Sequence, residues 1–300
     1  MISFFSFFHL YGLLIGLGVV VGYMIVERQS RYFEIDPQWM DRLFFFVAIP
    51  TLIGARVYHL ITDWQLYTHA SFIDLIAVWR GGLGFLGAIG GGLVGLLFFV
   101  FFTHKEISRT EKEIFNPSAD GQFSISKRIS KVTFLFTILD LLSFGIPIAQ
   151  AIGRLGNYVN GELYGLPTTL PWGIMINGQR YHPLFAYEAI LNVVLFFCLL
   201  RLSRGSLKSS TPPSLPSTRG GNSRGLLALG KGQYFSLYLF GYGLIRFWLE
   251  YLRIDTARMN GVLGMISIAQ WVCVGLMIGG LTLFWIRRHA PRKEWDWSLE

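Results

Sequence analysis

The chain has 300 residues, of which 52% are hydrophobic and 16% aromatic, and its mean hydropathy is +0.47. A soluble domain of this length does not need so much apolar surface for its core, so the composition excludes an ordinary soluble protein and indicates a polytopic membrane protein. The formal net charge is +8. Because the basic residues gather in a few loops, the charge reflects membrane topology, and we expect no nucleic-acid partner.

Apolar segments long enough to cross a bilayer recur along the chain, since about 20 such residues span the hydrocarbon. They lie near residues 4–26, 43–61, 83–103, 132–152, 183–202, 234–253 and 262–286. The sequence therefore predicts an all-α fold with about seven transmembrane helices, forming a single transmembrane domain over residues 1–300. Lysines and arginines concentrate in alternate loops and in the C-terminal tail, which predicts an outside N-terminus and a cytoplasmic C-terminus.

Three polar segments separate the predicted spans. Residues 104–131 are charged and polar, and residues 203–232 are rich in Ser, Pro and Gly, so we expect two flexible loops on the cytoplasmic side. Residues 158–181 contain Pro167, Pro171 and Trp172 and are too short for a domain. We expect this third segment at the outer face, over whatever the helices enclose.

Glycines dominate residues 81–95, which read GGLGFLGAIGGGLVG. A GxGxxG pattern is present, but no strand precedes it and it runs into a membrane span, so it is not a nucleotide site. Gly87, Gly91 and Gly95 repeat every four residues and favour close approach of another helix. The alternative is that backbone N–H groups of residues 81–84 face a phosphate.

Cysteine and histidine chemistry is sparse. Cys198 and Cys273 both lie inside apolar spans, where packing is the favoured interpretation over a nucleophile or a disulfide. The six histidines follow no metal-ligand spacing, so the sequence predicts no metal site.

The segment GRLGNYVNGELYG, residues 153–165, places charged and amide side chains directly at the end of a predicted span. A charge at bilayer depth costs roughly 2.5 to 3.5 kcal/mol on insertion scales. Arg154 therefore needs a partner or a function.

Polar side chains from five spans fall at a similar depth when 1.5 Å of rise is counted per residue. They are His9, Tyr11, Arg56, Arg154, Asn157, His182, Tyr187, Glu188, Tyr242, Arg246 and Glu250. This pattern predicts one polar cavity in the outer leaflet. Arg246 and Glu250 are four residues apart and neutralise each other in one alternative; in another, Arg56 pairs with Glu188 or Glu162.

The anions abundant at that depth are lipid phosphates. Arginine stays ionised and grips phosphate with a planar fork of donors. We therefore expect Arg56, Arg154 and Arg246 to bind a phospholipid headgroup.

At these residues the chain resembles the prolipoprotein diacylglyceryl transferases, whose signature is similar to residues 153–165 almost position for position. HLYGLLIG at 9–16, GARVYH at 54–59, HPLFAYE at 182–188 and GYGLIRFWLEYLRID at 241–255 resemble its other blocks in the same order, and SIAQ at 267–270 is a weaker match. The resemblance covers all the predicted spans and omits the two cytoplasmic segments.

The resemblance implies an enzyme of the bacterial cytoplasmic (inner) membrane, with its active site toward the outer leaflet. It implies transfer of the diacylglyceryl group of phosphatidylglycerol to the lipobox cysteine of a prolipoprotein, forming a thioether and releasing glycerol phosphate. The implied partners are phosphatidylglycerol, the lipobox segment and the surrounding membrane lipids, and we expect no cofactor.

The resemblance also implies roles for particular residues. The essential arginines are Arg154 and Arg246, the tyrosines are Tyr11 and Tyr242, and the polar signature residues are Asn157, Asn160, Glu162 and Gly165.

Two positions depart from the family pattern. Leu86 stands where many members have a histidine, which removes a candidate general base, and Phe185 stands where they have glutamine. His182 is the nearest remaining base candidate, the alternative being that it fixes the outer segment. These departures keep open a catalytically silent lipid-binding paralogue, and an anion or lipid transporter is the other alternative.

Overall fold

A computed structural model describes residues 4–33, 35–68, 70–114, 130–208, 229–254 and 266–289. Each predicted span coincides with a helix. The long helices are α1 (Phe4–Ser30), α2 (Gln38–Thr62), α4 (Phe85–Ile114), α5 (Lys131–Val159), α6 (Leu184–Lys208), α7 (Gln233–Leu249) and α8 (Ile268–His289). The first four residues of the predicted last span lie outside the described residues.

Six helices of the described chain, all of these except α7, are long and apolar enough to cross a membrane. The shorter α7 has 17 residues and continues into the 3-10 turn η4 (Glu250–Leu252). Large apolar side chains face outward along the helices, among them Leu13, Met24 and Phe197, as expected where lipid replaces water. The prediction of an all-α polytopic membrane protein is confirmed, and the orientation of the termini stays a prediction.

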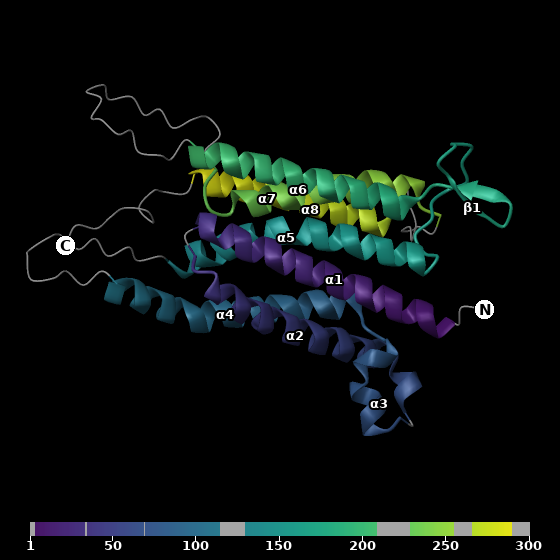
Figure 1. Cartoon of the computed structure of the whole chain (residues 1–300), viewed down its shortest axis with the longest axis horizontal. Helices are drawn as coiled ribbons and strands as arrows, with labels where there is room; N and C mark the ends of the chain where they lie inside the picture. Colours follow the sequence, from purple (N-terminus) through teal and green to yellow (C-terminus); the bar gives the residue numbers. More distant parts are fainter. Residues whose placement is uncertain are drawn as a thin grey trace, which may run out of the picture. The chain divides into compact units, whose positions relative to one another are not determined.

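The chain forms two compact units. The first contains α1, most of α5, α6, α7 and α8, and Figure 1 shows α5 to α8 running alongside one another with a hairpin at one end. Small residues let its helices approach closely. Gly22 of α1 lies against Gly145 and Ala149 of α5, and Gly280 of α8 lies against the backbone of Ser236 in α7.

The second unit pairs α2 with α4, with the short α3 (Phe72–Ile76) at one end of the pair (Figure 1). A Cβ atom added at Gly87 would meet the carbonyl of Gly54, and one added at Gly91 would meet that of Pro50. Gly95 faces α2 in the same way. The predicted glycine packing face is therefore confirmed.

The polar segments contain more regular structure than predicted. The expected loop from residue 104 begins as helix, because α4 continues to Ile114, and residues 115–129 lie outside the described residues. The segment from 203 likewise begins as helix, since α6 reaches Lys208, and residues 209–228 are not described. A helix can continue through charged residues, because these residues end the apolar span and not the helix.

The outer segment carries a two-stranded hairpin of β1 (Ile174–Ile176) and β2 (Gln179–Tyr181). Asn177 and Gly178, which join the strands, both have positive φ. Asn-Gly is the residue pair typical of a two-residue hairpin turn, so the sequence held a signal for these strands.

A buried carboxylate caps α7 from another helix. Asp140 of α5 accepts hydrogen bonds from the backbone N–H groups of Gly232 (2.6 Å) and Phe235 (2.8 Å) at the start of α7. It satisfies donors that a helix start leaves free. Sequence spacing gave no sign of this contact, because it joins residues 92 positions apart.

Neighbouring glycines of α4 allow a matched test of the packing face. Gly91→Ala should destabilise the protein by about 1–3 kcal/mol, because the added methyl meets the α2 backbone. Gly90→Ala should be neutral or stabilising by up to about 1 kcal/mol, because no atom lies within 4 Å of the added Cβ and alanine favours helix. Thermal unfolding in detergent measures both, and equal unfolding temperatures for the two variants would contradict the packing role.

Candidate active site

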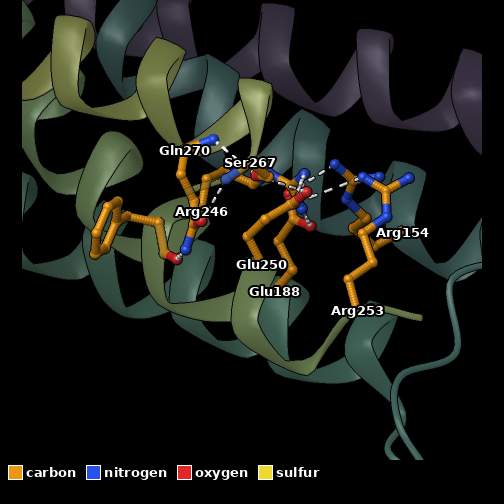
Figure 2. Close-up of polar contacts among 8 residues, drawn as sticks. Arg154, Glu188, Arg246, Glu250, Arg253, Ser267 and Gln270 are labelled. Atoms are coloured by element: carbon orange, nitrogen blue, oxygen red, sulfur yellow. Dashed lines mark hydrogen bonds and ion pairs between the residues drawn. The ribbon is translucent and has the colours of Figure 1, made fainter. Parts of the chain in front are cut away.

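The carboxylate of Glu188, near the start of α6, joins two arginines from two other helices. Its Oε1 lies 2.7 Å from Nη2 of Arg154 in α5, and its Oε2 lies 3.1 Å from Nη1 of Arg246 in α7. Glu188 is 1% exposed, whereas the arginine side chains keep 23% and 16%. Figure 2 shows the two arginines converging on this carboxylate.

The cluster lies at one end of the first unit because of helix direction. Arg154 is near the end of α5, Arg246 is near the end of α7, and Glu188 is near the start of α6. The hairpin-bearing segment joins α5 to α6 at that same end (Figure 1). Arg154, Glu188 and Arg246 thus meet at one end of this unit, and their depth in the membrane stays a prediction.

The end of α5 builds one side of the site. Gly161, at φ 69°, donates its N–H to the carbonyl of Tyr158, and Glu162 donates its N–H to that of Asn157 (2.8 Å). These two bonds form a Schellman motif, which requires a left-handed residue such as glycine just past the helix. The motif turns Glu162 back over the last turn of α5.

Amides connect Glu162 to Arg154. Arg154 donates to Asn157 Oδ1 (3.3 Å), and Asn157 Nδ2 donates to Glu162 Oε2 (3.3 Å). Asn160 Nδ2 donates to the other oxygen of Glu162 (3.3 Å). The structure thus brings these four sequence-predicted residues into one network.

The predicted tyrosines lie beside the same helix end. Tyr242 lies beside Arg154, and its ring stacks on Tyr238 with centroids 5.9 Å apart. The ring of Tyr11 packs over Gly156, where an added Cβ would lie 2.8 Å from it. Tyr242 therefore contacts the charged cluster directly, and Tyr11 covers the turn of α5 between Arg154 and Asn157.

Arg246 has a second carboxylate partner. Glu250, one turn further along, lies 3.3 Å from Nη2 of Arg246, which confirms the ion pair considered from sequence. Arg253 reaches the same Glu250 oxygen at 3.7 Å. Three arginines and two carboxylates give this cluster a formal charge of +1.

His182 belongs to a different hydrogen-bonded group. Its Nδ1 lies 3.2 Å from the hydroxyl of Tyr187, which also accepts from the indole N–H of Trp172 (2.8 Å). These contacts tie the outer segment to the start of α6. They favour the alternative in which His182 fixes that segment.

Gly165 ties the outer segment to the end of α7. Its N–H donates to the carbonyl of His182 (2.8 Å), and the next N–H, of Leu166, donates to the carbonyl of Leu252 (2.7 Å). A Cβ at Gly165 would lie 2.6 Å from that Leu252 oxygen. Glycine is needed here because the two backbones approach closely.

Arg56, in the second unit, is surrounded by backbone carbonyls. Its Nε donates to Leu75 (2.9 Å), its Nη1 to Gly81 (2.8 Å) and Gly82 (3.0 Å), and its Nη2 to Asp74. The N–H of Gly84 donates to Ala55 (2.9 Å). Arg56 thus holds the segment between α2 and α4 through backbone carbonyls, and its pairing with Glu188 or Glu162 stays a prediction. Its binding of lipid stays a prediction.

The two departures from the family pattern differ in environment. Leu86 is 62% exposed in the first turn of α4. Phe185 is buried and packs against the rings of Tyr158 (5.1 Å) and Tyr164 (6.1 Å). Phe185 therefore stabilises the outer segment, while Leu86 leaves room for a larger polar side chain.

The sequence placed Glu188 and Glu250 in the predicted polar cavity, but neither was predicted as a catalytic or lipid-binding residue. Both are acidic residues inside predicted spans, and both stand in family-like blocks, HPLFAYE and GYGLIRFWLEYLRID. Buried carboxylates opposite buried arginines need no other explanation than charge compensation. This need for charge compensation was the signal in the sequence that could have identified the two glutamates as site residues.

The geometry suits an anionic group. Two guanidinium groups, both still partly exposed, point at one place from different helices, with a tyrosine and an asparagine beside them. Arginine pairs bind phosphate more firmly when water is scarce. Apolar helices that enclose such a cluster define an integral membrane protein with a charged polar site at one end of its first unit.

Comparison with known proteins names the family. Residues 2–112 and 122–286 match the model of the family described as prolipoprotein diacylglyceryl transferase. The chain therefore belongs to the prolipoprotein diacylglyceryl transferase family and is an enzyme of the membrane.

Curated relatives agree with this assignment. The chain is 29% identical to a phosphatidylglycerol–prolipoprotein diacylglyceryl transferase of Prochlorococcus marinus subsp. pastoris, over 95% of this chain and 90% of the relative. It is 30% identical to proteins of the same name from Tropheryma whipplei, over 90% of this chain and 87% of the relative, and Synechococcus elongatus, over 94% and 85%.

Two glutamates of the site allow a matched stability test. Glu188→Gln should destabilise the protein by about 3 kcal/mol, the low end of the range for breaking a buried pair, because both arginines keep some exposure. Glu162→Gln should change stability by no more than about 0.5 kcal/mol, because Glu162 is exposed and contacts amides. Thermal unfolding in detergent compares them, and an unaffected Glu188→Gln would show that the two arginines do not depend on this carboxylate.

Proposed function

We propose that this protein transfers the diacylglyceryl group of phosphatidylglycerol to the thiol of the lipobox cysteine of prolipoproteins. The observation that carries the proposal is the pair of partly exposed arginines, Arg154 and Arg246, held by the buried Glu188 between membrane helices. The family membership and the names of the relatives support the same substrates.

The reaction balances without a cofactor. The cysteine thiolate attacks C3 of the diacylglyceryl group, the new bond is a carbon–sulfur thioether, and the carbon–oxygen bond to phosphate breaks. The bonding electrons leave on the phosphate oxygen as glycerol phosphate departs. The thiol proton passes to a base. His182 is the candidate from sequence, while its contact with Tyr187 favours a structural role, so the assignment of the base depends on the test at position 86 below.

Arg154 and Arg246 have two roles in this scheme. A free cysteine with a pKa of about 8.5 is only a few per cent thiolate near neutral pH, so positive charge nearby raises the reactive fraction. The same guanidinium groups bind the phosphate and stabilise the charge that develops on it. Each donor placed for a developing charge is worth about 3–4 kcal/mol in other enzymes.

The neighbouring residues orient the lipid headgroup. Tyr242 and Asn157 contact Arg154, and Tyr11 covers the adjacent turn of α5. Asn160, Glu162 and Gly165 shape the turn beyond. We assign them to headgroup binding together with Arg56.

We place the protein in the bacterial cytoplasmic membrane with this site toward the outer leaflet. The basic segments fall on the opposite side of the predicted spans from the segment of residues 158–181. A lipobox cysteine that has just emerged from translocation meets phosphatidylglycerol at that leaflet.

Product analysis tests the function. The protein is reconstituted into phosphatidylglycerol vesicles with a lipobox peptide, and mass spectrometry is expected to detect a diacylglyceryl group on the peptide. A peptide with serine in place of the cysteine is the control. A transporter or a silent lipid-binding paralogue would leave the cysteine peptide unmodified, and that result would reject the proposal.

Substitution of the arginines tests their role. Arg154→Lys and Arg246→Lys keep a positive charge near Glu188 but lose the planar fork, so each should lower the rate of thioether formation by about 100-fold or more. Arg180→Gln, which removes an exposed arginine of β2, is the control and should leave the rate unchanged. Full activity in either lysine variant would remove that arginine from the mechanism.

Position 86 tests the missing base. Leu86→His should raise the rate above a pH of about 6.5, where imidazole is neutral and accepts a proton, and should give little gain below it. Leu86→Gln, polar but not basic, should give no gain. The exposure of Leu86 means that neither change requires repacking. Equal rates for both variants across the pH range would argue against a base at this position.

A further inference from the structure

The segment SIAQ, residues 267–270, forms a capping box at the start of α8. The Oγ of Ser267 accepts the N–H of Gln270 (3.1 Å), and Oε1 of Gln270 accepts the N–H of Ser267 (2.9 Å). Such reciprocal bonds satisfy two donors that a helix start leaves free. Both side chains are buried, at 2% and 3% exposure.

Each side chain of this capping box also reaches the end of α7. The hydroxyl of Ser267 donates to Oε1 of Glu250 (3.3 Å), and Nε2 of Gln270 donates to the carbonyl of Phe247 (3.3 Å). A serine hydroxyl has one proton to donate and lone pairs to accept. The proton therefore goes to Glu250, while a lone pair caps α8.

Glu250 passes this constraint to an arginine of the site. Its other oxygen, Oε2, accepts from Nη2 of Arg246 (3.3 Å), and Glu250 itself is only 3% exposed. Figure 2 shows Ser267, Glu250 and Arg246 as one continuous chain of contacts. Arg246 is thus held by Glu188 from α6 and by Glu250, which α8 holds in turn.

We propose that Ser267 and Gln270 are positioning residues for diacylglyceryl transfer, because they fix Glu250 and so aim Arg246. This inference rests on the proposed function. An arginine side chain has many rotamers. The reaction is slower when the guanidinium that stabilises a developing charge is not held in the required position. A capping box used only to start α8 would not need a proton donated to Glu250.

The test separates capping from positioning. Ser267→Gly removes the hydroxyl. Glycine is tolerated at a cap position, but the buried Glu250 also loses a hydrogen-bond donor, so the unfolding temperature should fall by about 2–8 °C. The rate of thioether formation should fall by about 10-fold or more. Ser267→Thr, which keeps a hydroxyl, should restore the rate.

A matched control lies at the far end of α5. Ser130 caps that helix by accepting the N–H of Thr133 (3.1 Å), so Ser130→Gly removes the same kind of cap away from the site. It should leave the rate unchanged. If Ser130→Gly lowers the rate as much as Ser267→Gly, the effect belongs to capping and the inference is overturned.

A double-mutant cycle asks whether Ser267 acts through Arg246. In an Arg246→Lys background, Ser267→Gly should reduce the remaining rate by less than about 2-fold, because the group it positions is already altered. Independent, multiplicative losses would overturn the inference. An active wild type with an unaffected Ser267→Gly would overturn it alone, whereas an inactive wild type would overturn the proposed function and this inference with it.

Discussion

The buried carboxylate of Glu188 between two arginines is the interaction on which the site depends. An arginine among apolar helices is costly unless a charge compensates it, and a carboxylate at 1% exposure is costly for the same reason. Together they are tolerated, and they join α5, α6 and α7 at one end. The arginine side chains keep 23% and 16% exposure, so the groups that compensate Glu188 are also the ones proposed to bind the lipid phosphate.

Around this carboxylate, backbone motifs at the helix ends hold the side chains of the site in position. A Schellman motif turns Glu162 over the end of α5, Gly165 lets the outer segment lie against the end of α7, and the α8 capping box reaches Glu250. Each device satisfies a helix end that would otherwise leave polar backbone groups unpaired in apolar surroundings. The ends of the helices are therefore also the places where the functional side chains are held.

The packing face formed by small residues could be predicted from the sequence. Gly87, Gly91 and Gly95 recur every four residues, so they lie on one face of the helix. In a membrane, such a face without side chains lets another helix approach closely. The packing of α2 on α4 follows that face. The cap that Asp140 places on α7 could not be predicted from the sequence, because no local pattern links residues so distant in the chain.

Sequence by itself determined the membrane class, the helical spans, the family and most of the polar residues at the site, because hydrophobic length and an arginine at a helix end are local properties. Tertiary structure decided the partners. Arg154 and Arg246 share Glu188, Arg56 binds carbonyls, and His182 pairs with Tyr187. The pairing of side chains depends on which helices are neighbours and on how each helix is rotated. The spacing of residues within one helix gives no information on either.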